Sequence, residues 1–336
     1  MSLFKRLFNV REPLTMDRPR SLAADQPEPH RFDGGADREV QVDIAASNAR
    51  FYDLLFGARA RASDKLNRLE QLVLDGIASQ LGDPELLANK VVRLPRILVR
   101  LRELLRDPDT GMADLEALVN QDAALAADVV RMANGPLFRT GSRELTSLKA
   151  ALVAIGTEGT AQVVTAALAA QLYRIKPIYF RLFGEKVWQH ALLTAVRIKA
   201  LAKGQGLDGD SLYLAGLIQS LGHVVIFRLL VDAFEQEEPG VQPDSLLFRR
   251  LMRQKGKQIS ALLAGQWQLP AELCGWLEEQ MLERPVSREG RLLKLASDQV
   301  VTLMLFREGL IQQSEYRALA VELEADADDL LALGST

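Results

Sequence analysis

Apolar residues recur at spacings of three and four positions along most of the chain, from about residue 47 almost to its end. Phe51, Leu54 and Leu55 open the pattern, which is first interrupted near residue 83. Such spacing places the apolar side chains on one face of an α-helix. Runs of β-branched residues are short, and no hairpin turn joins two alternating segments. The pattern therefore predicts an all-α protein.

Helix breakers and capping residues divide the chain into a series of expected helices. Asp122 is a capping residue ahead of one apolar run, which stops at the Gly135-Pro136 pair. Pro95 begins another helix, which ends at Asp107. The remaining helices are expected over residues 112–120, 123–134, 146–155, 157–173, 178–203, 208–231, 244–255, 258–267, 271–281, 287–308 and 314–332.

Composition divides the chain into four parts. Residues 1–46 hold four prolines, mixed charges and few apolar residues, which predicts a disordered segment and linker. We expect an N-terminal helical hairpin over 47–90, a main domain over 91–310 with halves 91–175 and 176–310, and acidic C-terminal helices over 311–336. The first ten residues, from Met1 to Val10, are amphipathic and basic. They are interpreted as a frayed terminus, with weak contact to a membrane surface as the alternative.

Charge and cysteine content exclude several classes of protein. The 336-residue chain has a formal net charge of −3, so it has no overall positive field and nucleic-acid binding is not expected. The single cysteine, Cys274, excludes an internal disulfide and is compatible with the reducing cytoplasm, where we expect the protein. No apolar run approaches the roughly 20 residues of a spanning helix, so no transmembrane segment is expected.

The stretch LVNQDAALAADVVRMANGPLFRTGSRELTSLKAALVAIGTEGTAQVV, residues 118–164, resembles the HDOD domain, the HD-related output domain of bacterial signalling proteins. The runs VWQHALLTA, YLAGLIQSLGHVVI and ALLAGQWQLPAEL continue the same family order further along the chain. The resemblance covers about residues 90–310. It implies a multi-helical HD-like bundle with an N-terminal helical extension, in which 176–310 forms a degenerate HD-like half.

Hydrolases with this helical arrangement hold one or two metal ions with a His-Asp pair and further histidines, and the metal makes a bound water reactive near neutral pH. The resemblance places Gln219, Ser220 and His223 where such a hydrolase has His, Asp and Lys. Two other histidine ligands fall on Gly256 and Gln280. The resemblance therefore implies a degenerate site with no catalytic residue, metal or cofactor.

Only two of the three histidines lie in the HD-like half, His190 and His223, and the sequence offers no carboxylate at the Asp position beside them. A single histidine on a leucine-rich helix is more often a core residue with satisfied hydrogen bonds than a metal ligand. We therefore expect both histidines to be structural.

HDOD proteins are similar to non-catalytic adaptors, so the resemblance implies an adaptor that binds a signalling enzyme or regulator, in cyclic-di-GMP or two-component signalling. The candidate interaction surface consists of Gln121, Asp122, Arg131, Asn134, Trp188 and His190, beside Gln219 and Ser220. The alternative is a weak HD-type phosphohydrolase, or a nucleotide-binding sensor that uses the old cavity with Arg131, Arg139 or Arg143 on the phosphate.

Overall fold

The structure is a computed structural model that describes residues 43–56, 65–82, 96–107, 109–173, 181–234 and 246–334. Over these ranges helices are the only regular elements, which confirms the predicted all-α class. Most of the predicted linker, with the amphipathic first ten residues, lies outside the described residues. The first described helix already begins at Ile44, ahead of the boundary expected at 46.

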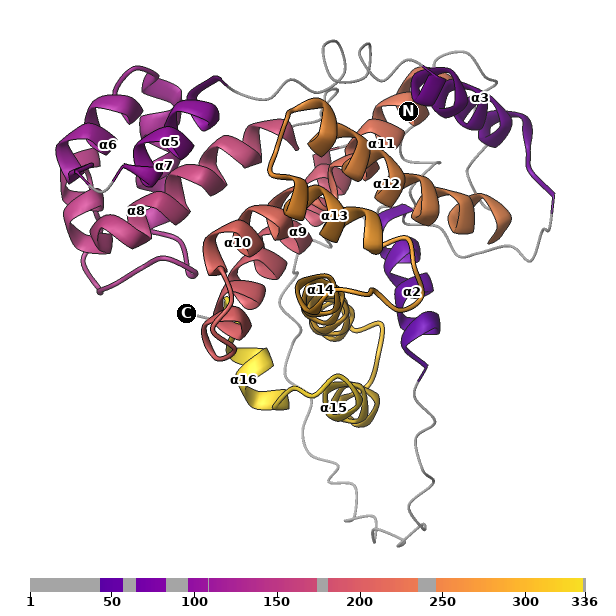
Figure 1. Cartoon of the computed structure of the whole chain (residues 1–336). Helices are drawn as coiled ribbons and strands as arrows, with labels where there is room; N and C mark the ends of the chain where they lie inside the picture. The colour runs from indigo at the N-terminus through magenta and orange to yellow at the C-terminus, as the bar shows by residue number, and fades with distance from the viewer. Residues whose placement is uncertain are drawn as a thin grey trace, which may run out of the picture.

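Figure 1 shows the helices in chain order. They are α2 (Ile44–Phe56), α3 (Arg68–Gly82), α5 (Arg96–Arg106), α6 (Met112–Val119), α7 (Ala123–Ala133), α8 (Leu148–Leu172), α9 (Arg181–Lys203), α10 (Gly209–Ile218), α11 (Leu221–Phe234), α12 (Leu246–Gln266), α13 (Ala271–Glu279), α14 (Arg288–Arg307), α15 (Gln313–Glu322) and α16 (Ala327–Ala332).

Helices α5 to α8 gather on one side of the molecule around their own apolar core (Figure 1). Leu101, Leu125 and Leu152 are fully buried at its centre. Helix α8 is interrupted at Gly156, whose φ of 72° and ψ of −179° are accessible mainly to glycine. This confirms the break expected between residues 155 and 157. The part of α8 after the break also packs on the larger core, so it joins the two halves of the protein.

Two of the polar residues singled out in the sequence stabilise this half locally. The Asp122 carboxylate caps α7 by accepting hydrogen bonds from the backbone N–H groups of Ala124 and Leu125. The Asn134 side chain donates to the Val130 and Leu145 carbonyls and accepts from the Leu145 N–H. Asn134 therefore ties the end of α7 to the loop that leads into α8.

The larger core is built around α9, which packs mainly against α10 and α14, while α11 packs against α12. The N-terminal helices add to this core at separate places: α3 lies on α11, whereas α2 lies mainly on α14. The two described helices of the hairpin expected over 47–90 therefore pack mainly on different helices of the bundle, and residues 57–64 and 83–90 lie outside the described residues. The acidic C-terminal helices also belong to this core, since Leu319 and Leu330 are fully buried.

Three helix boundaries differ from those expected. The single helix expected over 208–231 is two helices, α10 and α11, separated at Gln219 and Ser220. The two helices expected over 244–255 and 258–267 are one continuous helix, α12, which runs through Gly256. The segment 314–332 is divided because Glu324 has a positive φ of 54° and the Asp326 side chain caps α16.

Within the part of the chain that the structure describes, two helical stretches are long and apolar enough to cross a membrane by length and composition, Leu148–Leu172 and Gly209–Ala233. Their most apolar windows are 44% and 78% buried inside the protein, respectively. The first stretch is bent at Gly156 and the second is divided at Gln219. Burial in the folded bundle accounts for much of this apolar character, as expected for core helices.

Candidate functional site

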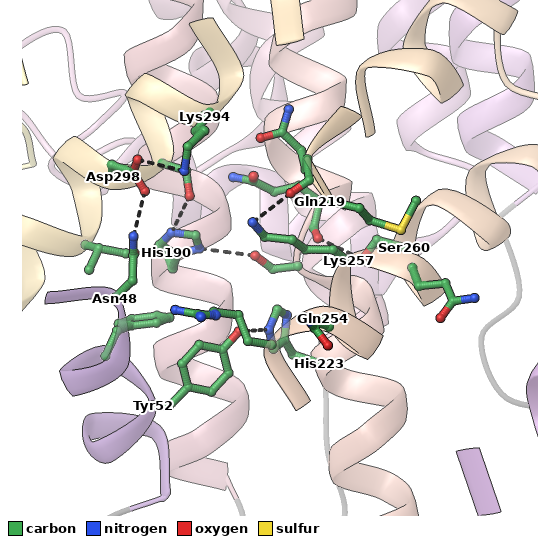
Figure 2. A pocket seen from close by; sticks show the side chains of 18 of the residues that line it. Asn48, Tyr52, His190, Gln219, His223, Gln254, Lys257, Ser260, Lys294 and Asp298 are labelled. Carbon is green, nitrogen blue, oxygen red and sulfur yellow. Dashed lines mark hydrogen bonds and ion pairs between the residues drawn. The ribbon is translucent and has the colours of Figure 1, made fainter. Parts of the chain in front are cut away.

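Four of the five degenerate HD positions, all except Gly256, line a cavity of about 790 Å³. Its walls come from α2, α9, the junction between α10 and α11, α12, the end of α13, and α14 (Figure 2). His190, Gln219, Ser220, His223 and Gln280 all line it. The structure thus brings together in one pocket residues separated by up to 90 positions in the sequence.

Both histidines of the pocket are held by hydrogen bonds. The two ring nitrogens of His190 lie 3.1 Å from Ser220 Oγ and 3.2 Å from Ser297 Oγ. The Tyr52 hydroxyl lies 2.6 Å from His223 Nε2 and, as a neutral phenol, donates to it. Figure 2 shows the contact between Tyr52 and His223.

Burial keeps both imidazoles neutral near pH 7. Desolvation lowers the pKa of His190 to about 3, with a smaller effect from His223 nearby. Desolvation also lowers the pKa of His223 to about 4, and the Lys257 ammonium acts in the same direction. The pKa of Tyr52 is raised well above its usual value, chiefly by burial, so its hydroxyl keeps its proton. These three groups form a neutral, hydrogen-bonded wall, as expected for structural histidines.

The break between α10 and α11, at Gln219 and Ser220, is stabilised by hydrogen bonds to Ser260 on α12. The Ser260 hydroxyl donates to the Gln219 carbonyl at 2.7 Å and accepts from the Gly222 N–H at 2.8 Å. It thereby satisfies two backbone groups that the divided helix leaves without an intrahelical partner. Ser220 contributes its hydroxyl to His190. At this position the chain therefore has hydrogen bonds within the protein in place of a metal ligand.

A side chain at Gly256, one of the two positions where a further hydrolase histidine was expected, would require the His223 ring to move. A Cβ on Gly256 would lie 2.8 Å from Cε1 and Nε2 of His223. From the opposite helix, a Cβ on Gly222 would lie 1.9 Å from the Gly256 carbonyl oxygen. The two glycines allow α11 and α12 to cross at backbone contact. The loss of a ligand at Gly256 is therefore part of the packing of the bundle.

Gln280 is used as a brace between helices. Its side-chain amide donates to the carbonyls of Trp276, 2.9 Å away, and Gly290, 3.0 Å away, which joins the end of α13 to the start of α14. Its backbone carbonyl accepts a hydrogen bond of 2.8 Å from Lys257 Nζ. Gln280 is only 5% exposed, and its amide N–H groups already donate to these two carbonyls, so they are not available to a ligand of the pocket.

Charged side chains from α12 and α14 give the pocket its electrostatic character. Lys257 and Arg253 line the pocket from α12, one helical turn apart. Lys294 and Asp298 line it from α14, and Figure 2 shows them together with Lys257. Asp298 accepts from Asn48 Nδ2 at 3.1 Å and pairs with Lys294 at 3.3 Å. Although no carboxylate stands at the Asp position that the resemblance identifies, α14 brings Asp298 into the same pocket from 75 residues beyond His223.

These donors do not fit a metal ion. Over the described residues no group of three or more His, Cys, Asp or Glu side chains is arranged to hold one. His190 and His223 use their ring nitrogens on neighbouring hydroxyls, and Asp298 is bound by an amide and an ammonium. The Lys257 ammonium lies close enough to His223 to lower its pKa, which also opposes a cation there.

The other residues of the expected interaction surface lie outside this pocket. Gln121 and Arg131 are exposed, and Arg131 forms a 2.6 Å ion pair with Asp128 on its own helix. Trp188 is half-buried and packs 5.3 Å from the Tyr173 ring, centroid to centroid. Asp122 and Asn134 are used as caps, as described above. Of the expected interaction surface, only His190, Gln219 and Ser220 therefore line the pocket.

The expected phosphate arginines also lie away from the cavity. Arg139 donates to the backbone carbonyls of Gly141 and Ser142, which orders its own loop. Arg143 is exposed in the same loop. The nucleotide-sensing alternative therefore receives no support from this arginine group, because none of its members lines the pocket.

Several pocket residues were not identified from the sequence. Tyr52 and Asn48 carry no local signal, because they meet His223 and Asp298 only after α2 docks on the bundle. The spacing of Lys294 and Asp298, four residues apart on a helix, is a signal that indicates an ion pair. Lys257 directly follows Gly256, an expected ligand position. Its place in the sequence was therefore a second signal, which indicated a lysine close to the site.

Comparison with known families places the chain among proteins of related fold. A family model described as the HDOD domain matches residues 91–281, which is more than half of the chain. An uncharacterized protein of Treponema pallidum (strain Nichols) is 28% identical over 189 residues, 54% of this chain. The chain spans only 35% of the length of that relative.

Two solved structures have a similar arrangement of helices. A candidate metal-dependent phosphohydrolase from Shewanella amazonensis SB2B has a TM-score of 0.54 at 21% identity, covering 80% of this chain and 99% of that one. An HDOD domain protein of unknown function from Geobacter sulfurreducens has a TM-score of 0.52 at 20% identity, covering 78% and 92%. At such identities the likeness shows the fold.

Proposed function

This chain belongs to the HDOD domain family, and from that premise we propose that it is a metal-free adaptor in signal transduction that acts by binding another protein. The observation that carries the proposal is the chemistry of the pocket. The side chains of Ser220, His223 and Gln280 make hydrogen bonds within the protein, and the Lys257 ammonium lies among them. Such a set supports a stable shape rather than activation of a metal-bound water.

The proposed partner is a signalling enzyme or regulator, in the cyclic-di-GMP or two-component settings typical of the family. The outer face of the N-terminal half supports this role, since Gln121 and Arg131 remain exposed there. Weak phosphohydrolase activity is the competing function, because His190 and Asp298 still share one cavity. The two functions differ in metal-dependent phosphodiester hydrolysis, which can be assayed directly.

The test is hydrolysis of bis(p-nitrophenyl) phosphate with added Mn²⁺, for the native chain and for His190→Asn and Asp298→Asn. We expect no metal-dependent turnover above that of the two variants. Turnover in the native protein that both substitutions abolish would overturn the proposal in favour of the phosphohydrolase.

Partner binding is tested in the same host cell with the full chain carrying an affinity tag. We expect a signalling protein to be retained by the native chain and to be retained less by a Gln121→Ala, Arg131→Ala double variant. A third variant, Glu324→Ala, serves as an exposed control far along the sequence. Retention that is unaffected by the double variant would contradict the part of the proposal that concerns this surface.

A further inference from the structure

The walls of the pocket carry an excess of positive charge. Its charged lining residues comprise four cations, Arg253, Lys255, Lys257 and Lys294, and two carboxylates, Asp298 and Glu283. The two histidines are neutral near pH 7, because burial lowers the pKa of each. The pocket therefore has two more positive than negative charges. In a cavity partly removed from water, this imbalance favours a bound anion.

Several donors of the pocket have hydrogen-bonding capacity to spare. Lys257 donates one hydrogen bond, to the Gln280 carbonyl, out of the three that an ammonium group can donate. Among the described residues Arg253 has no hydrogen-bond or ion-pair partner, and the buried Nε2 of Gln219 has none either. A buried donor without a partner costs free energy, which a ligand that accepts the hydrogen bond recovers.

The cations also repel one another. The pKa of Lys257 is lowered to about 8, chiefly by burial and also by the nearby Lys294 and Arg253, while Asp298 acts in the opposite direction. Asp298 is itself shared with Lys294 and Asn48. One carboxylate therefore offsets only part of the repulsion within this group, and an anion placed among the three cations would relieve the rest.

The rest of the wall fits an organic group. Phe51, Tyr52, Leu55, Val187 and Val301 form apolar and aromatic surface beside the cations. A volume of about 790 Å³ falls in the range of pockets that take small ligands and exceeds the need of an inorganic ion. Arginine and lysine are the side chains that bind phosphate, with charge-assisted hydrogen bonds.

We propose that this pocket is a binding site for a small organic phosphate, whose doubly charged phosphate group is held by Lys257 and Arg253 with a hydrogen bond from Gln219. The organic part lies against Phe51 and Tyr52. The inference rests on the proposed metal-free function, because the Lys257 ammonium, and not a metal ion, would neutralise the phosphate charge. A dianion matches the excess of two positive charges.

Isothermal titration of the full chain in EDTA tests the site with three probes: inorganic phosphate, pyrophosphate and adenosine 5′-monophosphate. We expect binding, with the mononucleotide tighter than inorganic phosphate because only it reaches the aromatic wall. Lys257→Met and Arg253→Gln are each expected to weaken binding by about tenfold or more. Arg250→Gln is the matched control, an exposed arginine on the same helix outside the pocket, and should bind as the native chain does.

Thermal unfolding of the unliganded variants shows whether they are folded. Lys257→Met removes a desolvated cation, so its melting temperature should equal or exceed that of the native chain. Absence of binding by all three probes at millimolar concentration would overturn the site while leaving the metal-free adaptor intact. Equal binding by native chain, Lys257→Met and Arg253→Gln would also overturn it. Binding that appears only after Mn²⁺ is added would overturn the site, and accompanying turnover would overturn the proposed function as well.

Discussion

Replacing Gly222 with alanine is expected to destabilise the protein by about 3 kcal/mol or more, because the added methyl group has no space. The Cβ would lie 1.9 Å from the carbonyl oxygen and 2.8 Å from the carbonyl carbon of Gly256. These are backbone atoms of α12, so no change of rotamer relieves the clash. Helices α11 and α12 would have to separate, which also disturbs His223 and the Ser260 bridge. Urea-induced unfolding of both proteins measures the effect.

The control for this prediction is Gly265→Ala, which lies on α12 itself. A Cβ at Gly265 would meet nothing within 4 Å. Alanine restricts the unfolded chain and favours helix more than glycine does, so this variant should be about 0.5–1 kcal/mol more stable than the native chain. Equal, small effects of the two substitutions would show that the helices do not cross at backbone contact.

Acid is expected to destabilise the protein well before most of its carboxylates are protonated. His190 and His223 have pKa values of about 3 and 4 in the folded chain, against about 6.5 when unfolded. Below about pH 6.5 the unfolded chain therefore binds more protons than the folded one, so stability falls as the pH falls. Each histidine that stays neutral contributes a loss of about 1.4 kcal/mol per pH unit. Together they predict a loss of up to about 4 kcal/mol between pH 6.5 and 5.

Urea unfolding of the native chain and of a His190→Asn, His223→Asn double variant over this pH range isolates the contribution of the histidines. The variant is expected to be less stable at pH 7, since it loses hydrogen bonds to Ser297 and Tyr52. Its stability should nevertheless change much less between pH 6.5 and 5, because the groups that still titrate, the carboxylates and His30, are common to both proteins. Parallel pH profiles would mean that the imidazoles are not buried in neutral form.

Local features of the fold could be predicted from the sequence. The cap at Asp122 and the break at Gly156 depend on the residue itself and its immediate neighbours, and both were expected. The division of α10 from α11 and the continuity of α12 through Gly256 could not be predicted in the same way. Both depend on the crossing of α11 and α12. There Ser260 supplies hydrogen bonds to the interrupted backbone, and Gly222 allows close contact with Gly256.

The candidate site was predicted only in part, because some of its residues meet through the packing of distant helices. The order of motifs located His190, Gln219, Ser220, His223 and Gln280, and all five line one pocket. Tyr52 lies 171 positions from His223, and no spacing rule relates residues so far apart. The charge of the pocket was also missed, because it depends on which face of α12 and α14 turns inward.

The N-terminal helix α2 forms part of the pocket wall although it precedes the family domain in the sequence. It lies outside residues 91–281, yet it supplies Asn48, Phe51 and Tyr52 to the wall of the pocket. Asn48 binds Asp298 and Tyr52 binds His223, so α2 is held at the site by two hydrogen bonds as well as by apolar contact. The pocket therefore depends on a segment that the family match does not include.

The central claim is that the degenerate site holds no catalytic metal, and counting metal ions tests it most directly. The full chain, purified without chelator and then dialysed against Mn²⁺, Fe²⁺ or Zn²⁺, is analysed for bound metal beside His190→Asn and Asp298→Asn. The account predicts far less than one ion per chain in the native protein and no difference from the variants. One or two ions per native chain, lost in both variants, would contradict it.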